Sequence, residues 1–269
     1  MKSKTYIIAW NEAIVNCIDI SQQLYGKVEH TFFNVSSTDN LNENWQRTDD
    51  VRYYRHFFNA INDFLQTDAD IFIFSAGDAK YENHVEYIKY MERIFSENPN
   101  LVAFAPNATH DFWVGKRSSI KPSSKYENLY LVTCINGIHF ALDRDTCVIL
   151  DNFYKWSSVD NKFIEPKEMI SGWGIDIMLS AYAIYNNKYC YKDSGVLFSH
   201  PATTHYNQTK AKQEQLRLIE EFSKFLEKEL SYDISRYQKI VSNISKFATE
   251  HRLMTIKDFY PEPEKLSYA

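Results

Sequence analysis

Short hydrophobic runs alternate with longer segments of helical periodicity over the first 109 residues of the chain. The runs are rich in Ile, Phe and Val and end in polar or turn-forming residues, which is typical of buried β-strands. We expect such strands at 5–11, within 29–40, at 70–78 and at 101–109. Between them, apolar residues recur at helical spacing, and we expect helices at 12–26, 51–67 and 82–99. This alternation predicts an α/β fold with a mostly parallel central sheet flanked by helices.

The middle of the chain is less regular. Residues 128–147 indicate one or two strands separated at Gly137, and 190–201 indicate a further strand that ends at His200-Pro201. Between these segments, residues 171–189 predict a Gly-Trp-Gly turn followed by an amphipathic helix.

Two charged helices are expected at about 209–230 and 234–251. The first carries an apolar stripe, formed by Leu216, Ile219, Phe222, Phe225 and Leu226. A stripe of this kind is more typical of core packing than of a membrane face. We therefore expect an α/β domain over 1–206 and a C-terminal helical extension over 207–269.

The polar residues that follow the first three strands share one predicted position. In open α/β sheets, ligands bind beyond the carboxyl ends of the strands. Asn11, Ser36 to Asp39 and Gly77-Asp78 all fall at that edge. Taken alone, Asp78 is as typical of an ordinary Gly-Asp turn as of a site.

Composition narrows the class of protein. The chain of 269 residues is 44% hydrophobic and 24% charged, as in ordinary globular proteins. A net charge of −5 disfavours non-specific nucleic-acid binding, which needs a basic surface. The 19 Tyr and 18 Phe fit either an aromatic-lined cleft for ring-shaped ligands or an aromatic core.

The N-terminus has no hydrophobic signal segment, and the four cysteines are scattered without a CxxC pair. Both features favour a cytoplasmic protein with reduced, structural thiols. Peripheral association with the inner face of a membrane is the alternative.

Several chemistries are excluded by missing motifs. No glycine follows the first strand, which excludes a dinucleotide fingerprint, and the chain has no P-loop. It also lacks a GxSxG elbow and an HExxH metal motif. What remains are isolated acidic and histidine residues at expected strand or helix ends: Asp78, Asp176, His200 and His205. Each also has an ordinary structural explanation, such as a turn residue for Asp78 or a partner of the helix dipole for Asp176.

The order of these segments resembles the A-type glycosyltransferase (GT-A, Rossmann-like) fold, especially its inverting, family-two-like members that use nucleotide sugars. The strongest match is Ser-Gly-Trp-Gly-Ile-Asp-Ile-Met-Leu at 171–179, which is similar to the family's G-W-G-x-(E/D)-D turn. Ser75-Ala76-Gly77-Asp78 stands where the family has its D-x-D metal motif. Weaker matches are 9–12 for P-T-Y-N, 34–39 for D-D-G-S-T-D, and 54–56 for A-R-N. The resemblance covers roughly residues 4–206.

The resemblance implies a glycosyltransferase that moves a sugar from a nucleotide-sugar donor to a glycan acceptor, such as a bacterial surface polysaccharide or lipooligosaccharide. Asp176 would remove the acceptor hydroxyl proton, and Asp78 with His200 would hold a divalent cation, Mn²⁺ or Mg²⁺, on the leaving diphosphate. The donor would be contacted by the residues that match the family's motifs: Ala9, Trp10, Asn11, Asn34, Ser36, Asp39, Arg55, Ser75, Gly77, Asp78 and Trp173. The C-terminal helices would cover the acceptor side, pair subunits in a homo-oligomer or touch the membrane.

Two departures from the family's pattern leave alternatives open. Ser75 and Gly77 replace acidic residues of the metal motif, so weak or absent metal dependence is one alternative. Asn34-Val35 replaces the acidic pair that contacts uracil, which leaves the base open, with UDP among the candidates. A protein that binds a nucleotide sugar or glycan without turnover is a further alternative. A nucleotidyltransferase is another, although such enzymes usually need a glycine-rich basic loop that this chain lacks.

Overall fold

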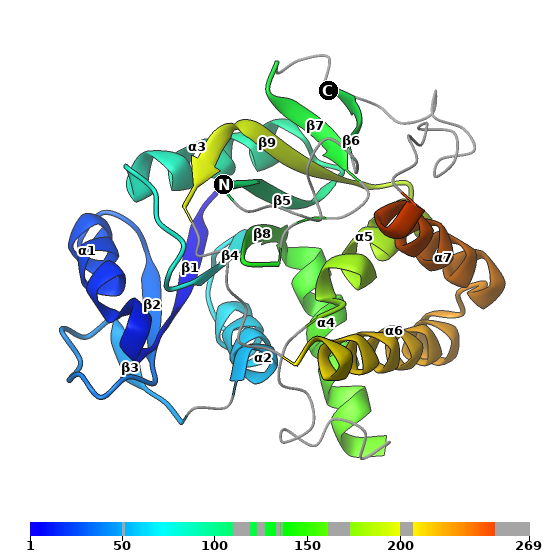
Figure 1. The fold of residues 1–269 in the computed structure, drawn as a ribbon, viewed down its shortest axis with the longest axis horizontal. Coiled ribbons are helices and arrows are strands. Elements are labelled where there is room, and N and C mark those ends of the chain that lie inside the picture. The colour runs from blue at the N-terminus through cyan, green and yellow to red at the C-terminus, as the bar shows by residue number, and fades with distance from the viewer. Residues whose placement is uncertain are drawn as a thin grey trace.

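A computed structural model describes residues 1–49, 52–109, 119–122, 127–132, 135, 137–160, 173–199 and 207–250. Within these residues, nine strands form a single sheet in the order β3-β2-β1-β4-β8-β5-β9-β7-β6 (Figure 1). The strands are β1 Ser3–Ala9, β2 His30–Asn34, β3 Trp45–Arg47, β4 Ile71–Ala76, β5 Leu101–Ala108, β6 Ser119–Pro122, β7 Leu129–Val132, β8 His139–Asp143 and β9 Tyr189–Phe198.

Most strands of the sheet run in the same direction, as the sequence predicts. β1 pairs in parallel with both β2 and β4, and β5 pairs in parallel with β9. β8 lies antiparallel between β4 and β5, so β4 and β5 themselves point the same way. The carboxyl ends of β1, β2, β4, β5 and β9 therefore meet at one edge of the sheet.

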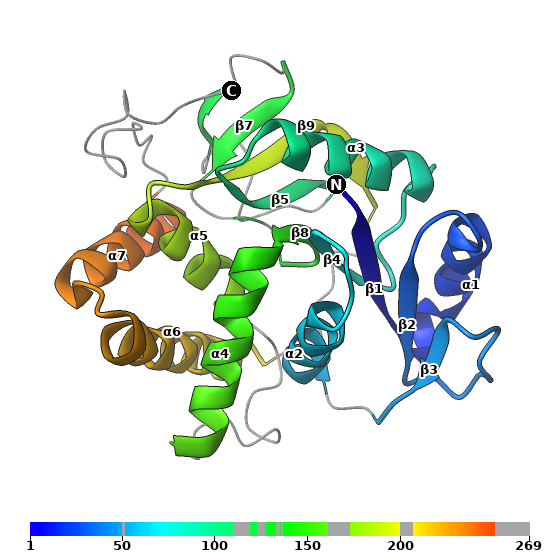
Figure 2. The ribbon, with the colours of Figure 1, turned by 180° about the vertical axis from the view of Figure 1, so that it is seen from behind.

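Helices cover both faces of the sheet (Figures 1 and 2). A short 3-10 turn, Asn11–Ala13, leads into α1, which packs beside α3 on one face, while α2 and α4 pack together on the other. α5 lies over β5 and β9 and also contacts α6 and α7. The helices are α1 Ile14–Leu24, α2 Arg52–Leu65, α3 His84–Glu97, α4 Arg144–Asp160, α5 Ile175–Tyr185, α6 Gln208–Leu230 and α7 Ile234–Glu250. One expectation needs correction: the strand expected within 128–147 ends at Asp143, and residues 144–147 begin α4.

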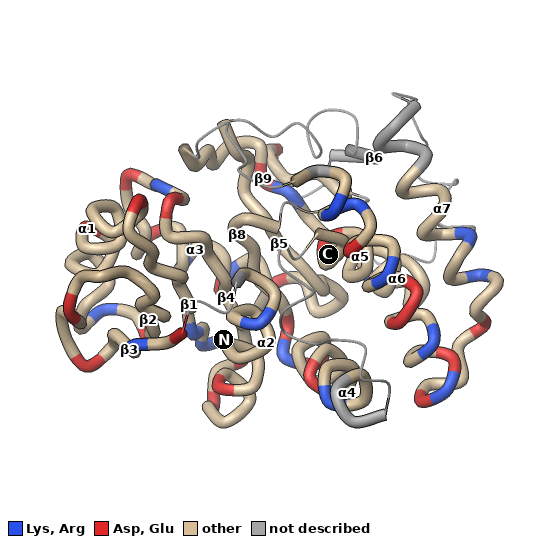
Figure 3. The backbone as a smooth tube through the Cα atoms, turned by 60° about the horizontal axis from the view of Figure 1, so that its bottom comes forward, with Lys and Arg blue, Asp and Glu red and all other residues tan. Residues whose placement is uncertain are grey.

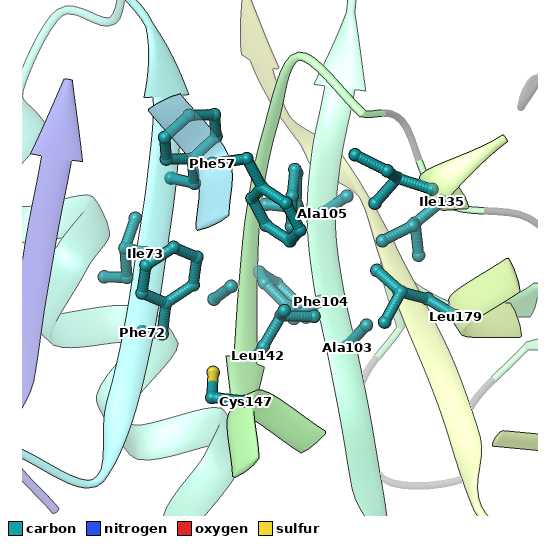
Figure 4. Close-up of a cluster of buried hydrophobic side chains, with 14 of the residues drawn as sticks. Phe57, Phe72, Ile73, Ala103, Phe104, Ala105, Ile135, Leu142, Cys147 and Leu179 are labelled. Atoms are coloured by element: carbon teal, nitrogen blue, oxygen red, sulfur yellow. The ribbon is translucent and has the colours of Figure 1, made fainter. Parts of the chain in front are cut away.

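The aromatic residues fill the core. The largest fully buried side chains are tyrosines and phenylalanines from both faces of the sheet. Phe57 of α2 packs edge-on against Phe72 of β4, with ring centroids 5.9 Å apart (Figure 4). It also packs edge-on against Phe74 of the same strand, at 5.4 Å. Edge-to-face pairs of this kind add stability beyond the area that they bury. The abundance of Tyr and Phe is therefore explained to a large extent by the core.

The C-terminal helices are part of the same hydrophobic core. Phe222 and Phe225 of α6 are buried and contact Phe153 of α4, with centroids 5.0 and 5.7 Å apart. Ile219 and Leu226 of the expected stripe are also buried. Leu216, the fifth member of that stripe, is 61% exposed, so its inclusion was wrong.

Positive and negative residues are interspersed along α6, whereas the charged residues of α7 before its last position are Lys and Arg (Figure 3). Within the described residues, none of the helices is long and apolar enough to cross a membrane. Cys17, Cys147 and Cys190 are buried free thiols, as the sequence predicts, and Cys134 lies outside the described residues.

Candidate functional site

The order in which the chain adds strands to the sheet reverses at β1: β2 and β3 lie on one side of it, and β4 lies on the other. Such a switch point leaves a crevice outside the carboxyl ends of the two strands that flank it. Ile8 of β1 is in register with Ala76 of β4. The residues that come next, Trp10-Asn11 after β1 and Gly77-Asp78 after β4, therefore flank this crevice.

Gly77 lies so close to β1 that no larger residue fits. A Cβ atom at this position would collide with the carbonyl oxygen of Ile8 and lie 2.5 Å from Sγ of Cys17. A side chain at position 77 would therefore be directed at β1 and α1, away from the crevice. Gly77, which the sequence analysis expects to contact the donor, packs closely against β1 and α1.

Asp78 follows this close contact and is half-buried. Burial and, to a smaller extent, the charge of Asp78 raise the pKa of the Cys17 thiol to about 12. Asp78 is thus a charged group held just above the packed end of β4. Ser75, in contrast, is buried within β4, and its hydroxyl donates to the carbonyl oxygen of Ala76 at 3.0 Å.

Two sets of hydrogen bonds hold the chain around Asp78. The Asn16 amide nitrogen of α1 donates to the carbonyl oxygens of Gly77 and Ala79, at 2.7 and 3.4 Å. On the other side, the backbone N–H groups of Lys80 and Ser199 each donate to the other residue's carbonyl oxygen, both at 3.0 Å. The end of β9 is thereby joined to the segment that carries Asp78.

The loop after β2 is organised by Asn34. This side chain is fully buried. Its amide nitrogen donates to Thr38 O and Asn40 Oδ1, both at 2.9 Å, and its Oδ1 accepts from both N–H and O–H of Ser36. The guanidinium of Arg47 also donates to the carbonyl oxygens of Ser36 and Thr38. The amide of Asn34, which the sequence analysis expects to contact the donor, makes these hydrogen bonds within its own loop.

Other expected donor-contacting residues lie nearer the surface. Asn11 is exposed, and its Oδ1 accepts from the backbone N–H of Ser37 at 2.7 Å, which joins the ends of β1 and β2. Asp39 is exposed, while Trp10 and Arg55 are half-buried. Ala9 is fully buried at the end of β1, so only its backbone can border the crevice.

The turn that precedes α5 brings Trp173 and Asp176 to the same edge of the sheet. α5 is joined to β9 by residues 186–188 only and packs against it, so it runs antiparallel to β9. Its first turn therefore lies at the edge where β9 and β4 end. Asp176 is half-buried in this turn, and its Oδ1 accepts from the N–H of Ile177 at 2.9 Å.

The turn itself is fixed by its own glycine and by α6. Gly174 has φ = 99°, a conformation that residues with a side chain rarely adopt. A Cβ atom at Gly174 would lie 3.0 Å from Cγ of Gln215 in α6. The C-terminal helices therefore support the turn that carries Asp176.

The described residues contain no group of three or more His, Cys, Asp or Glu side chains that could hold a metal ion. His200 and His205 lie outside the described residues. Asp78 is thus the carboxylate at the D-x-D position on which a metal site would depend.

The positions that sequence patterns did not single out are Asn16, Cys17 and the Lys80–Ser199 pairing. Asn16 and Cys17 look like ordinary members of an amphipathic helix. The one feature of the sequence that could have indicated them is that a polar and a small residue lie together on the side of α1 that must face the end of β4.

No protein-family model matches the chain, and comparison with curated proteins gives no significant match. Among solved structures, the crystal structure of GalNAc-T7 with UDP, GalNAc and Mn²⁺ is similar over 99% of this chain, with 11% sequence identity and a TM-score of 0.56. This chain spans 57% of the length of that one.

Two further solved structures are less similar. The mannosyltransferase PcManGT from Pyrobaculum calidifontis, in complex with GDP-Man and Mn²⁺, has 10% identity and a TM-score of 0.48, covering 93% of this chain and 73% of that one. Glucosyl-3-phosphoglycerate synthase from Mycobacterium tuberculosis, with Mn²⁺, UDP-Glc and phosphoglyceric acid, has 10% identity and a TM-score of 0.49, covering 82% and 79%. The likeness to GalNAc-T7, together with the strand order, shows the fold: this chain has the A-type (GT-A) glycosyltransferase fold.

Proposed function

We propose that this chain is a glycosyltransferase that moves a sugar from a nucleotide-sugar donor to a hydroxyl group of a glycan acceptor. The observation that carries the proposal is the position of two carboxylates on one edge of a GT-A sheet. Asp78 stands at the switch point after β4, and Asp176 stands in the first turn of α5. The Lys80–Ser199 pairing joins the segment that carries Asp78 to the end of β9, and α5, which carries Asp176, packs over β5 and β9.

On the donor side, the exposed and half-buried side chains are proposed to contact the nucleotide sugar. These are the side chains of Trp10, Asn11, Asp39, Arg55, Asp78 and Trp173. The buried residues Asn34, Ser36, Ser75 and Gly77, with the backbone of Ala9, are assigned to shaping the crevice. UDP is the first nucleotide to test, because the similar GalNAc-T7 structure contains it.

Asp78 and His200 are proposed to hold a divalent cation, Mn²⁺ or Mg²⁺. The donor chemistry fits in part: Mg²⁺ in phosphate sites is often held by one or two carboxylates, with substrate phosphates and water as the other ligands. The Lys80–Ser199 pairing supports the proposal, because Ser199 directly precedes His200 in the chain and Lys80 comes two residues after Asp78. When bound, the cation would neutralise charge on the leaving diphosphate.

Asp176 is proposed as the general base. As the acceptor oxygen attacks the anomeric carbon, its proton passes to a carboxylate oxygen of Asp176, and the bond between the sugar and the diphosphate breaks. Attack from the side opposite the leaving group inverts the configuration at this carbon. Trp173, three residues earlier, is placed to offer an apolar face to a sugar ring.

For the acceptor, we propose a bacterial-type surface glycan, either a polysaccharide or a lipooligosaccharide. This assignment rests on the resemblance of the motifs alone. It entails action in the cytoplasm or at the inner face of the membrane. Self-association through α6 and α7 is the corresponding proposal for the C-terminal helices.

One observation favours a second candidate, a protein that binds a nucleotide sugar or glycan without turnover. Gly77 has no room for a carboxylate, so the metal motif keeps only Asp78. The two candidates differ in whether sugar is transferred, and a single substitution separates them.

The test begins with thermal unfolding of the full chain in the presence of UDP-, GDP- and CMP-sugars, with and without Mn²⁺. Stabilisation by one class of nucleotide is expected, because a ligand that binds only the folded state raises its melting temperature. Donor turnover is then measured for Asp176→Asn and for Asp145→Asn, which removes an exposed carboxylate from the first turn of α4.

Turnover should fall at least about 100-fold in Asp176→Asn, with nucleotide binding retained, and stay unchanged in Asp145→Asn. Undiminished turnover in Asp176→Asn would exclude Asp176 as the base. Binding without any turnover in the wild type would establish the second candidate.

A further inference from the structure

Asn16 of α1 makes the contacts that fix the chain on both sides of Asp78. Its amide nitrogen carries two hydrogens, and the two carbonyl oxygens within reach are those of Gly77 at 2.7 Å and Ala79 at 3.4 Å. These are the residues immediately before and after Asp78. We propose that Asn16 is a positioning residue, which sets where the Asp78 carboxylate stands at the rim of the sheet.

The Asn16 contact completes a set of restraints on residues 77–80. Gly77 is confined by the backbone of Ile8, and Lys80 is hydrogen-bonded to Ser199. The N–H of Ala79 donates to the carbonyl oxygen of Ala76 at 3.1 Å, which closes the turn. What is left to fix is the rotation of the peptide groups between Gly77 and Asp78 and between Ala79 and Lys80, and the Asn16 amide holds the carbonyl oxygens of both, those of Gly77 and Ala79.

The contribution of Asn16 to overall stability should be small. Its own Oδ1 is buried and has no hydrogen-bond partner among the described residues. A buried acceptor without a partner carries a desolvation cost that offsets much of the gain from the hydrogen bonds of the same side chain. Truncation at Asn16 should therefore change the geometry around Asp78 more than it changes the melting temperature.

This inference rests on the proposed role of Asp78, but its structural part can be tested without any ligand. The first measurement is amide hydrogen exchange of the full chain by NMR, read at Ala79 and Lys80 and at β1 as an internal reference. Asn16→Ala should lower the protection of Ala79 and Lys80 about tenfold and leave β1 unchanged. Gln22→Ala, at an exposed position of the same helix, is the matched control and should change neither.

Asn16→Asp gives a signature that loss of packing would not produce. The substitution keeps the size of the side chain but places a carboxyl group against two carbonyl oxygens. The neutral carboxyl can donate a hydrogen bond, whereas the carboxylate is repelled, so the pKa of the new carboxyl is raised. Protection of Ala79 and Lys80 should therefore be near the wild-type value at pH 5 and fall about tenfold at pH 8.

The second measurement is the affinity of UDP with Mn²⁺, by calorimetry, for the wild type, Asn16→Ala, Asp78→Asn and the double variant. Asn16→Ala should weaken binding about tenfold, and the double variant should be no weaker than Asp78→Asn alone, because both changes act through one carboxylate. Unchanged exchange at Ala79 and Lys80 in Asn16→Ala overturns the inference, whatever binds. So does a double variant whose losses simply add. If Asp78→Asn leaves affinity unchanged while the exchange effect is present, the proposed role of Asp78 fails and the local restraint by Asn16 stands.

Discussion

Acid should destabilise this protein through two buried histidines, His84 at the start of α3 and His139 at the start of β8. Both side chains are almost fully buried against the ring of Tyr81, with ring centroids 4.9 and 5.0 Å away. Burial lowers the pKa of His84 to about 4 and that of His139 to about 3, and mutual repulsion adds to the effect at His139. Neither ring nitrogen of His139 has a hydrogen-bond partner among the described residues.

The sign of the effect follows from proton counts. Between pH 6.5 and about 4, the unfolded chain binds a proton at each of these histidines and the folded chain does not, so the free energy of unfolding falls as the pH falls. pH 5 lies about 1.5 units below the pKa of a histidine in the unfolded chain, ~6.5. At ~1.4 kcal/mol per unit, each histidine lowers the free energy of unfolding by ~2 kcal/mol at pH 5, and the pair lowers it by ~4 kcal/mol. This loss is a large part of the 5–15 kcal/mol by which domains are typically stable.

Urea denaturation followed by circular dichroism, at pH 7 and at pH 5, measures this loss. The variant His139→Phe keeps an aromatic ring and removes the titrating group, so it should lose ~2 kcal/mol less than the wild type over this interval. Half-buried Asp143 and buried Asp193, whose carboxyl pKa values are raised, act with the opposite sign but cancel in the difference between the proteins.

Tyr81→Phe is the matched control. This substitution alters the same cluster but removes no group that titrates between pH 5 and 7. The variant should therefore lose as much free energy of unfolding as the wild type over this interval. Equal losses in His139→Phe and the wild type would refute the claim that His139 stays neutral in the fold.

Three further outcomes are expected. Gly77→Ala should lower the free energy of unfolding by about 3 kcal/mol in urea titrations, because the new Cβ atom would overlap the β1 backbone. Gly137→Ala is the control: its Cβ atom would meet no atom within 4 Å, so it should change the free energy of unfolding by less than about 1 kcal/mol. A mild effect at Gly77 would show that the end of β4 can shift. Phe222→Ala should cost about 3–5 kcal/mol and preserve a single unfolding transition, since α6 shares the core; two separate transitions would instead show an independent C-terminal unit. Asn34→Ala should speed amide exchange of the loop over residues 36–40 at least about tenfold, and unchanged exchange there would contradict the role given to its amide.

The alternating part of the fold could be predicted from the sequence because local pattern and tertiary environment agree there. β1 ends in four consecutive apolar residues, 6–9, and β4 begins with four, 71–74, as expected for strands buried on both faces. Gly26, expected to end the first helix, has φ = 69° just after it. Here the propensities of the residues, the turn residues at the ends of the elements and the pattern of buried positions all favour the same structure.

The pattern failed where packing decides the structure. Residues 144–160 form α4, although Thr146, Cys147 and Val148 have modest helix propensity. The helix forms because its apolar face packs against α2 and α6, contacts that no local pattern contains. β3 is a three-residue edge strand, too short to have a detectable period.

For the candidate site residues, the sequence predicts positions at strand ends but not the directions in which the side chains point. The sequence places Asn34, Ser75 and Asp78 alike at strand ends, and only the structure separates them. Asn34 is turned into its own loop, Ser75 lies within the strand, and Asp78 stands beyond it. A polar side chain at a strand end can either hydrogen-bond within the protein or stand beyond the strand. Which of the two occurs depends on which backbone groups nearby lack a hydrogen-bond partner.

The departure from the D-x-D pattern follows from the same packing. Position 75 is buried inside the sheet, and position 77 is closed by Ile8 and Cys17, so a carboxylate at either place would be buried against apolar or backbone atoms. An unpaired buried carboxylate is strongly unfavourable. Asp78 is the first residue after β4 that is only half-buried, and its neighbours Gly77 and Ala79 are held through their carbonyl oxygens by the Asn16 amide. Moving the carboxylate back to position 77 by Gly77→Asp with Asp78→Ala should therefore fail to restore binding of UDP with Mn²⁺ and should destabilise the fold, because α1 already occupies the space that the side chain would need.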